Sequence, residues 1–259
     1  MNLDHKNTTI FYTHHGKGDA VVLLHGFLEN SNIWEPFVAE LSKNNRIICI
    51  DLLGHGKTGC LGKIHTMELM AECVHIVLKQ LKIYKAIFIG HSMGAYVGLA
   101  FAEIKPECVT RLCLVNSTAE ADSIEKQKNR ERAIEAVKHY PETFIRMGIS
   151  NLFQSKNRVV FSNDIKRITN EALQMSSQAI IASLEGMKIR KDRTHILKNS
   201  RFKQMMIIGK KDPVLNYDRL IQQTNNTAVK IIEFPDGHMS YIENKPIFLH
   251  TLVHFIENK

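Results

Sequence analysis

The stretch AIFIGHSMGAYVGLAFAE, residues 86–103, decides the fold. Its first five residues are apolar or very small and predict a buried strand, whereas the segment after Ser92 has the pattern of a tightly packed helix. Ser92 stands in the turn between them, with Gly90 and Gly94 on either side. A serine that only capped the helix would not need both glycines, so they indicate a very tight turn. Gly-x-Ser-x-Gly between a strand and a helix is typical of a nucleophile elbow, which holds a serine hydroxyl at the carboxyl edge of a sheet.

Buried strands alternate with helices on both sides of this turn. Continuous apolar strands joined by helices are typical of parallel sheets that are covered on both faces. We therefore expect an α/β fold with a mostly parallel, doubly wound sheet. The segment TTIFYTHH (8–15), followed by GKGD, predicts a first strand that forms a hairpin with the strand after it. The other predicted strands are AVVLLHG (20–26), RIICID (46–51), TRLCLVN (110–116), KQMMIIG (203–209) and VKIIEF (229–234).

The alternation stops after the strand at 110–116. Residues 119–199 show no clear strand and read as helices joined by polar turns, and the alternation resumes from residue 200. We therefore predict a core made of residues 1–118 and 200–259, with 119–199 inserted as a helical cap.

Composition limits the classes of protein that this chain can be. It has 259 residues, 44% of them hydrophobic and 23% charged, as in an ordinary globular protein. No apolar run reaches the roughly 18 residues of a membrane span, and the N-terminus carries no apolar leader, so we expect no membrane span and a cytoplasmic location. The five cysteines are odd in number, and Cys49, Cys73 and Cys113 fall in apolar segments, which favours free thiols.

The net charge of +8 is concentrated in one segment. Residues 120–204 carry 17 Lys and Arg against 10 Asp and Glu, a surplus of seven. A solvated, lysine-rich surface explains this surplus. The alternative is a basic lid that attracts an anionic substrate, with Arg190, Lys191 and Arg193 as its candidates. Acidic residues are mixed with the basic ones and no aromatic residues alternate with them, so nucleic-acid binding is not expected.

A serine nucleophile needs a base to take its proton and an acid to orient that base. In a parallel sheet these groups are expected at the carboxyl ends of other strands. Asp212 follows the strand at 203–209, and His238 follows the strand at 229–234 in a loop that contains glycine. The chain order Ser92, Asp212, His238 is the order of the nucleophile-elbow class, so these three residues are the predicted catalytic triad.

Acyl transfer also requires donors for a developing oxyanion. The backbone N–H of Met93, directly after the nucleophile, is the first predicted donor. The loop LLHGFLEN (23–30) follows an early strand, and Gly26 in it permits close approach of the backbone. The backbone N–H of Phe27 is therefore the second predicted donor.

Together these segments resemble the α/β-hydrolase fold family over nearly the whole chain. The resemblance rests on HGF (25–27), DLLGHGKT (51–58), GHSMG (90–94), GKKDPV (209–214) and DGHMSYIENKP (236–246). It implies a helical cap after the sixth strand, where 119–199 lies, and a structural role for Asp51. Some relatives carry the acid after the strand at 110–116, where this chain has Asn116. Dehalogenase-type and epoxide-hydrolase-type relatives have Asp at the elbow, so Ser92 argues against both.

These residues predict a serine hydrolase that cleaves a small carboxylic ester, lactone or thioester through an acyl-enzyme. Two alternatives stay open. The chain also resembles the menaquinone-pathway synthase that forms 2-succinyl-6-hydroxy-2,4-cyclohexadiene-1-carboxylate, a carbon–carbon lyase in which basic cap residues would hold substrate carboxylates. The third possibility is a non-catalytic receptor on the same fold. No His-Glu-x-x-His or Cys-x-x-Cys motif occurs, so we expect no metal and no cofactor, with a small acyl molecule as the partner.

Overall fold

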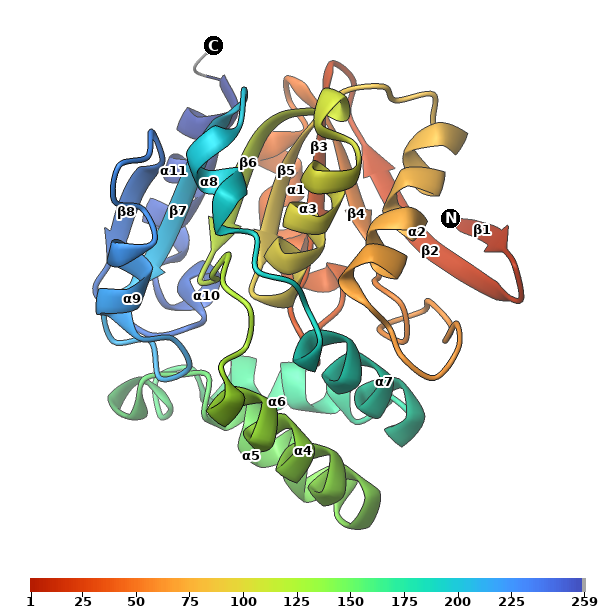
Figure 1. Cartoon of the computed structure of the whole chain (residues 1–259), viewed down its shortest axis with the longest axis vertical. Coiled ribbons are helices and arrows are strands. Elements are labelled where there is room, and N and C mark those ends of the chain that lie inside the picture. The colour runs from red at the N-terminus through yellow and green to blue at the C-terminus, as the bar shows by residue number, and fades with distance from the viewer. Residues whose placement is uncertain (258–259) are drawn as a thin grey trace.

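The computed structural model describes residues 1–257 and contains one eight-stranded sheet with helices on both faces (Figure 1). The strand order is β1-β2-β4-β3-β5-β6-β7-β8. The pairs β1–β2 and β2–β4 are antiparallel, and all later neighbours are parallel, so the predicted α/β fold with a mostly parallel sheet is confirmed. The strands are β1 (Asn2–His5), β2 (Thr8–His15), β3 (Asp19–Leu24), β4 (Asn45–Ile50), β5 (Ala86–His91), β6 (Val109–Val115), β7 (Lys203–Gly209) and β8 (Lys230–Phe234).

The predicted hairpin between β2 and β3 is wrong. β4 lies between these two strands and pairs with both of them. The turn that follows β2 contains Gly16 and Gly18, both with positive φ (+73° and +112°). A Cβ on Gly16 would lie 2.3 Å from the carbonyl oxygen of Asn45, the first residue of β4. The turn therefore passes over the amino end of β4, so that β3 pairs with β4 on the side opposite β2.

Helices cover both faces of the sheet. In Figure 1, α2 and α3 lie in front of the sheet, and α1 and α11 lie behind it, where Phe37 of α1 contacts Phe248 of α11. Cys49, Cys73 and Cys113 are buried, and all five cysteines are free thiols, as predicted. The core helices are α1 (Glu35–Leu41), α2 (Met67–Gln80), α3 (Met93–Ile104), α9 (Tyr217–Gln222), α10 (Ser240–Glu243) and α11 (Lys245–Glu257), with the 3₁₀ helices η1 (Ser31–Trp34) and η2 (Pro106–Cys108).

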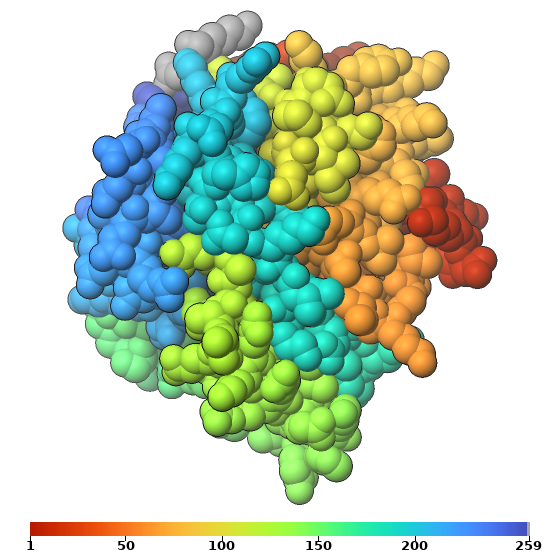
Figure 2. Space-filling view, viewed as in Figure 1, coloured from red at the N-terminus to blue at the C-terminus, as the bar shows by residue number. Residues whose placement is uncertain are grey.

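Five helices lie between β6 and β7 in the chain. They are α4 (Ile124–His139), α5 (Pro141–Ser150), α6 (Ser162–Ala172), α7 (Ser177–Lys188) and α8 (Thr194–Asn199), with the 3₁₀ helix η3 (Ser155–Asn157). The first four form a lobe at one edge of the core, and Figure 2 shows this lobe packed closely against it. The last helix, α8, instead packs on α3 beside the sheet. The lobe therefore lies at the edge of the sheet where the parallel strands end.

Candidate active site

Ser92 occupies the sharp turn between β5 and α3. Its backbone has φ +48° and ψ −113°, which is a strained conformation for a residue with a side chain. A Cβ on Gly90 would lie 2.4 Å from the Ala95 nitrogen, and a Cβ on Gly94 would lie 2.4 Å from the Leu24 carbonyl oxygen. Both glycines are therefore required, one because the turn folds onto itself and the other because it packs against the end of β3.

Asp212 and His238 meet at the same edge of the sheet. Nδ1 of His238 lies 2.7 Å from Oδ2 of Asp212, and both side chains are almost fully buried. Burial by itself raises the pKa of the Asp212 carboxyl, but the His238 charge and hydrogen bond outweigh burial and lower that pKa below its ordinary value. Because Nδ1–H of His238 is donated to a carboxylate, Nε2 is the nitrogen left to accept a proton.

The loop after β7 holds the Asp212 carboxylate in place. Its second oxygen, Oδ1, accepts hydrogen bonds from the backbone N–H groups of Val214 and Leu215, at 2.8 and 3.1 Å. A carboxylate that is fixed by its own loop on one oxygen presents the other oxygen to His238 in one orientation. This arrangement suits a group whose work is to orient an imidazole.

Asn116, which stands where some relatives carry their acid, is a further residue of this site. It follows β6, has φ +45°, and is completely buried. Its side-chain nitrogen lies 3.2 Å from Oδ2 of Asp212 and 3.1 Å from the carbonyl oxygen of Gly237. The sequence offered one signal for this role, an asparagine directly after a predicted strand. Asparagine tolerates the left-handed backbone conformation better than most residues, so it suits a sharp turn at that place.

The loop after β3 lies against the start of α3, as the oxyanion prediction requires. Nδ1 of His25 lies 2.7 Å from the carbonyl oxygen of Gly26, while its Nε2 accepts the backbone N–H of Leu52 at 2.9 Å. His25 therefore donates from Nδ1 and fixes the plane of the peptide that carries the Phe27 N–H. Within residues 1–257, the backbone N–H groups of Phe27 and Met93 have no hydrogen-bond acceptor. Their role as oxyanion donors stays a prediction.

Asp51, which the family resemblance assigned to the scaffold, anchors two loops. Its Oδ1 accepts the backbone N–H of Ser31, and its Oδ2 accepts that of Lys57, each at 2.8 Å. The hydroxyl of Thr58 donates to its carbonyl oxygen at 2.7 Å. These contacts are all internal to the scaffold, and both carboxylate oxygens of Asp51 take part in them.

A segment of the inserted lobe packs on the His238 loop. The His238 backbone N–H donates to the Leu152 carbonyl oxygen at 3.1 Å. The Asn157 side chain donates to Asp236 at 3.1 Å and to Glu243 at 2.8 Å. Burial raises the pKa of the Glu243 carboxyl. Residues 152–157 are therefore held directly over the predicted base.

The structure contradicts the idea that Arg190 and Arg193 form a basic lid. Arg190 is buried, lies 2.6 Å from the Asp122 carboxylate and stacks 4.1 Å from the Tyr96 ring. Arg193 is also buried and lies 2.5 Å from Glu68 and 2.9 Å from Glu103. A charge that is buried and paired attracts no ligand from solution. Of the three proposed residues, only Lys191 is exposed.

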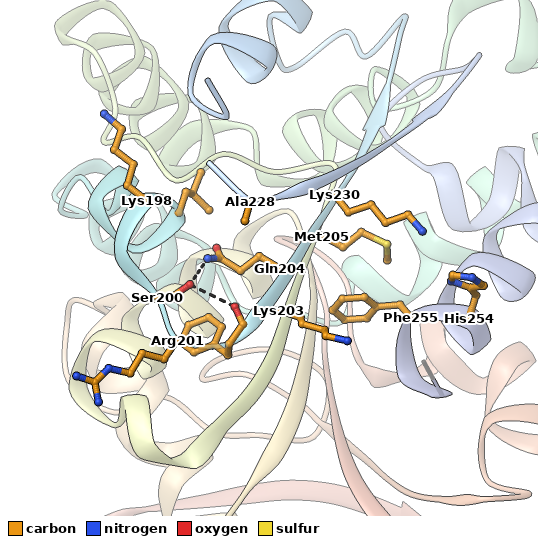
Figure 3. Close-up of a pocket in the computed structure, with 12 residues that line it drawn as sticks. Lys198, Ser200, Arg201, Lys203, Gln204, Met205, Ala228, Lys230, His254 and Phe255 are labelled. Carbon is orange, nitrogen blue, oxygen red and sulfur yellow. Dashed lines mark hydrogen bonds between the residues drawn. The ribbon is translucent and has the colours of Figure 1, made fainter. Parts of the chain in front are cut away.

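A cavity of about 570 Å³ lies away from Ser92, Asp212 and His238, between α8, β7, β8 and α11. Figure 3 shows Lys203, Gln204 and Met205 in its lining, and these are the first residues of β7. It therefore opens at the amino ends of the strands, on the edge opposite the predicted triad.

Within the described chain, no group of three His, Cys, Asp or Glu side chains could hold a metal ion. None of the described helices combines the length and hydropathy needed to cross a bilayer.

Three kinds of comparison relate the chain to known proteins. A curated protein of Bacillus subtilis (strain 168), named "Putative 2-succinyl-6-hydroxy-2,4-cyclohexadiene-1-carboxylate synthase", is 30% identical over 181 residues. The match covers 65% of this chain and 64% of that protein, so the chain spans less than two thirds of its relative. Among solved structures, a thermophilic esterase from Thermogutta terrifontis with malate bound is 25% identical, with a TM-score of 0.88 over 96% of this chain and 93% of the esterase.

The enol-lactonase from Burkholderia xenovorans LB400 has the same fold. It superimposes with a TM-score of 0.91 over 100% of both chains at 21% identity. A family model described as the alpha/beta hydrolase fold matches residues 19–245, which confirms the resemblance seen in the sequence. The chain belongs to the α/β hydrolase fold family.

Proposed function

We propose that this protein is a serine hydrolase that cleaves a small carboxylic ester, lactone or thioester. The observation that carries the proposal is the 2.7 Å contact between His238 and Asp212, at the sheet edge that also holds Ser92 in its strained turn. Ser92 is the nucleophile, His238 the general base and Asp212 the group that orients His238. The esterase and the enol-lactonase among the structural neighbours support this class of reaction.

In the first half of the reaction, Ser92 Oγ attacks the acyl carbon while Nε2 of His238 takes the hydroxyl proton. The carbonyl oxygen becomes an oxyanion and accepts hydrogen bonds from the N–H groups of Phe27 and Met93. The bond to the leaving group then breaks, and His238 returns the proton to the departing oxygen or sulfur. The product of this half-reaction is an acyl ester on Ser92.

In the second half, water replaces the leaving group. His238 removes a proton from the water as its oxygen attacks the acyl-enzyme, and the same two N–H groups hold the new oxyanion. Collapse releases the carboxylic acid, and His238 gives its proton back to Ser92 Oγ. The reaction consumes one water and needs no redox partner.

A carbon–carbon lyase is the second candidate, because the Bacillus subtilis relative carries a synthase name. In that reaction Ser92 and His238 would abstract a proton from substrate instead of forming an acyl-enzyme. The basic cap that would hold substrate carboxylates has lost two of its candidates, since Arg190 and Arg193 are bound to buried carboxylates. The ester hydrolase is therefore the better supported proposal.

A panel of p-nitrophenyl esters with increasing acyl length tests the proposal. We expect release of p-nitrophenol by the wild-type protein, a clear preference for short acyl groups, and no release above background by Ser92→Ala. Hydrolysis by Ser92→Ala at the wild-type rate would place the nucleophile elsewhere. A folded wild-type protein that hydrolyses none of these esters would favour the lyase or a non-catalytic receptor on the same fold.

A further inference from the structure

A second buried network lies beside the predicted triad. The side chains of Glu29 and His91 are 0% and 1% exposed, and Oε2 of Glu29 lies 2.9 Å from Nδ1 of His91. The same oxygen accepts the Gly26 N–H at 2.6 Å, and Oε1 accepts the Tyr241 hydroxyl at 3.0 Å. The other ring nitrogen of His91, Nε2, lies 3.0 Å from the carbonyl oxygen of His238. No step of the proposed reaction uses either side chain.

The contacts of His91 favour its protonated form. Both of its ring nitrogens face oxygen atoms, a carboxylate and a backbone carbonyl. A neutral imidazole has one N–H and can donate to only one of them, whereas an imidazolium donates to both. A buried imidazolium requires a counter-charge, because an isolated charge in the interior is strongly disfavoured. The Glu29 carboxylate is in direct contact and supplies it.

The groups that surround the pair agree with this assignment. Burial lowers the pKa of His91, but the Glu29 charge and hydrogen bond, with a smaller contribution from Asp212, raise it above its ordinary value. Burial raises the pKa of Glu29, but the charge and hydrogen bond of His91, together with the hydrogen bond from the Gly26 N–H, lower it below its ordinary value. Both groups are therefore held in their charged forms by each other.

The pair connects three of the chain segments that carry the predicted catalytic groups. Glu29 holds Gly26, which precedes the predicted oxyanion donor Phe27. His91 immediately precedes Ser92 in the chain and holds the backbone of His238. Gly26 has no room for a side chain here, since a Cβ would lie 2.7 Å from Glu29 Oε2 and 2.8 Å from His91 Nδ1. One ion pair thus fixes the loop that carries Phe27 (the oxyanion loop) relative to the loop that carries His238 (the His238 loop).

We propose that Glu29 and His91 form a permanent buried ion pair that positions the oxyanion loop and the His238 loop for the transition state. Neither side chain touches the reacting atoms, so both are positioning residues. The inference rests on the proposed triad chemistry for its effect on rate, while the charge state of His91 does not depend on it.

The variant Glu29→Gln removes the negative charge and keeps the size of the side chain. Without that charge His91 is neutral. If the amide nitrogen takes the place of Oε2, it donates to Nδ1 of His91 but leaves the Gly26 N–H without its acceptor. If the amide oxygen takes that place, His91 donates from Nδ1 and loses its hydrogen bond to His238. Misplacement of a catalytic group by about 1 Å costs about 10²-fold in rate, so we expect kcat for a p-nitrophenyl ester to fall by about 10- to 100-fold. The KM should change by less than about threefold, because the ground-state contacts with substrate are intact.

Glu103→Gln is the matched control. Glu103 is also a carboxylate bound to a buried cation, Arg193, but it lies near the end of α3, away from the triad. We expect Glu103→Gln to lower thermal stability and to leave kcat unchanged. An equal fall of kcat in both variants, or an unchanged kcat in Glu29→Gln, would overturn the positioning role.

The charge state of His91 is measured in the wild-type protein, so it does not depend on any variant folding. Long-range ¹H–¹⁵N spectra at pH 7, assigned with His91→Asn, should show protons on both ring nitrogens of His91. A proton on one nitrogen only would overturn the ion pair. If the wild-type protein cleaves no ester, the proposed function fails by that result alone, and the spectrum still decides whether the ion pair exists.

Discussion

The side-chain nitrogen of Asn116 lies 3.2 Å from Oδ2 of Asp212, although 96 residues separate the two in the chain. The same nitrogen contacts the Gly237 carbonyl oxygen, so Asn116 joins the loop of the predicted acid to the loop of the predicted base. Two strand ends, those of β6 and β7, therefore present a side chain to one point next to His238. One of these side chains is a carboxylate, and the other is its amide counterpart.

Asp212→Asn should keep the fold and lose most of the activity. The backbone N–H groups of Val214 and Leu215 keep the amide oxygen on their side, so the amide nitrogen faces His238. The imidazole then accepts at Nδ1 and carries its proton on Nε2, which is no longer the basic nitrogen. We expect turnover to fall by up to about 10⁴-fold, the loss known for the same change in a serine protease. Steady-state hydrolysis of a p-nitrophenyl ester measures the effect, and near-full activity in a folded Asp212→Asn protein would rule out this triad.

The double variant Asn116→Asp, Asp212→Asn exchanges the two side chains. Because both reach the same point, the carboxylate at position 116 should take over the hydrogen bond to His238. We expect turnover at least about 10-fold above that of Asp212→Asn alone, since aligned general acid–base groups contribute about 10²- to 10⁴-fold. The single variant Asn116→Asp is the control, and we expect it to be impaired because it places two carboxylates side by side. No recovery in the double variant would show that position 116 cannot orient the imidazole.

Asn157→Ala should loosen the lobe segment that lies over His238. The variant removes hydrogen bonds to Asp236 and Glu243, and bonds to charged groups contribute about 1.5–3 kcal/mol each. We expect faster amide hydrogen exchange in residues 152–157 and in the 236–238 loop, with exchange in β5 and β6 unchanged. Asn163→Ala, on α6 of the same lobe, is the control, and similar acceleration in both variants would mean that the lobe loosens as a whole.

The Asp122–Arg190 pair should stabilise the protein in a pH-dependent way. Burial raises the pKa of the Asp122 carboxyl, but Arg130 and Arg190 outweigh burial and lower it below its ordinary value. The stabilisation is therefore present above about pH 4, where the unfolded carboxyl is already ionised, and is lost as pH falls through the lower folded-state value. At pH 7, Asp122→Asn leaves the Arg190 charge buried and should lower the free energy of unfolding by about 3–5 kcal/mol.

Urea unfolding of wild type and Asp122→Asn at pH 7 and at pH 3 measures this difference. We expect it to be large at pH 7 and clearly smaller at pH 3. Glu135→Gln, which removes the carboxylate of an exposed pair with Lys138, is the control and should leave the unfolding curve unchanged at both pH values. A difference of equal size at both pH values would show that ionisation of Asp122 is not its source.

Much of the fold could be predicted because strong local patterns carry it. The buried strands around Ser92 have continuous apolar sequences, and Gly90 and Gly94 mark the tight turn independently of any distant contact. The hairpin prediction failed because pairing between strands is a long-range property. Adjacent strands in sequence with a short glycine turn usually pair, but the turn at Gly16 is shaped by its contact with Asn45, which no local pattern reveals.

The same distinction explains the site. The positions of Ser92, Asp212 and His238 after strands predicted one sheet edge, since all parallel strands end there. The roles of Asn116 and Glu29 depend on partners 96 and 62 residues away, Asp212 and His91, so they could be seen only in three dimensions. The surplus of basic residues was counted correctly, but a count does not distinguish an exposed lysine from a buried arginine such as Arg193, which is bound to two carboxylates.

The central claim is that Ser92 is a nucleophile activated by His238. The most direct test is to treat the protein with a fluorophosphonate probe and locate the adduct by peptide mass spectrometry. We expect one adduct per chain, on Ser92, no adduct in Ser92→Ala, and a strongly slowed reaction in His238→Ala, with both variants folded. An adduct on another residue, or none on a folded wild-type protein, would contradict the claim.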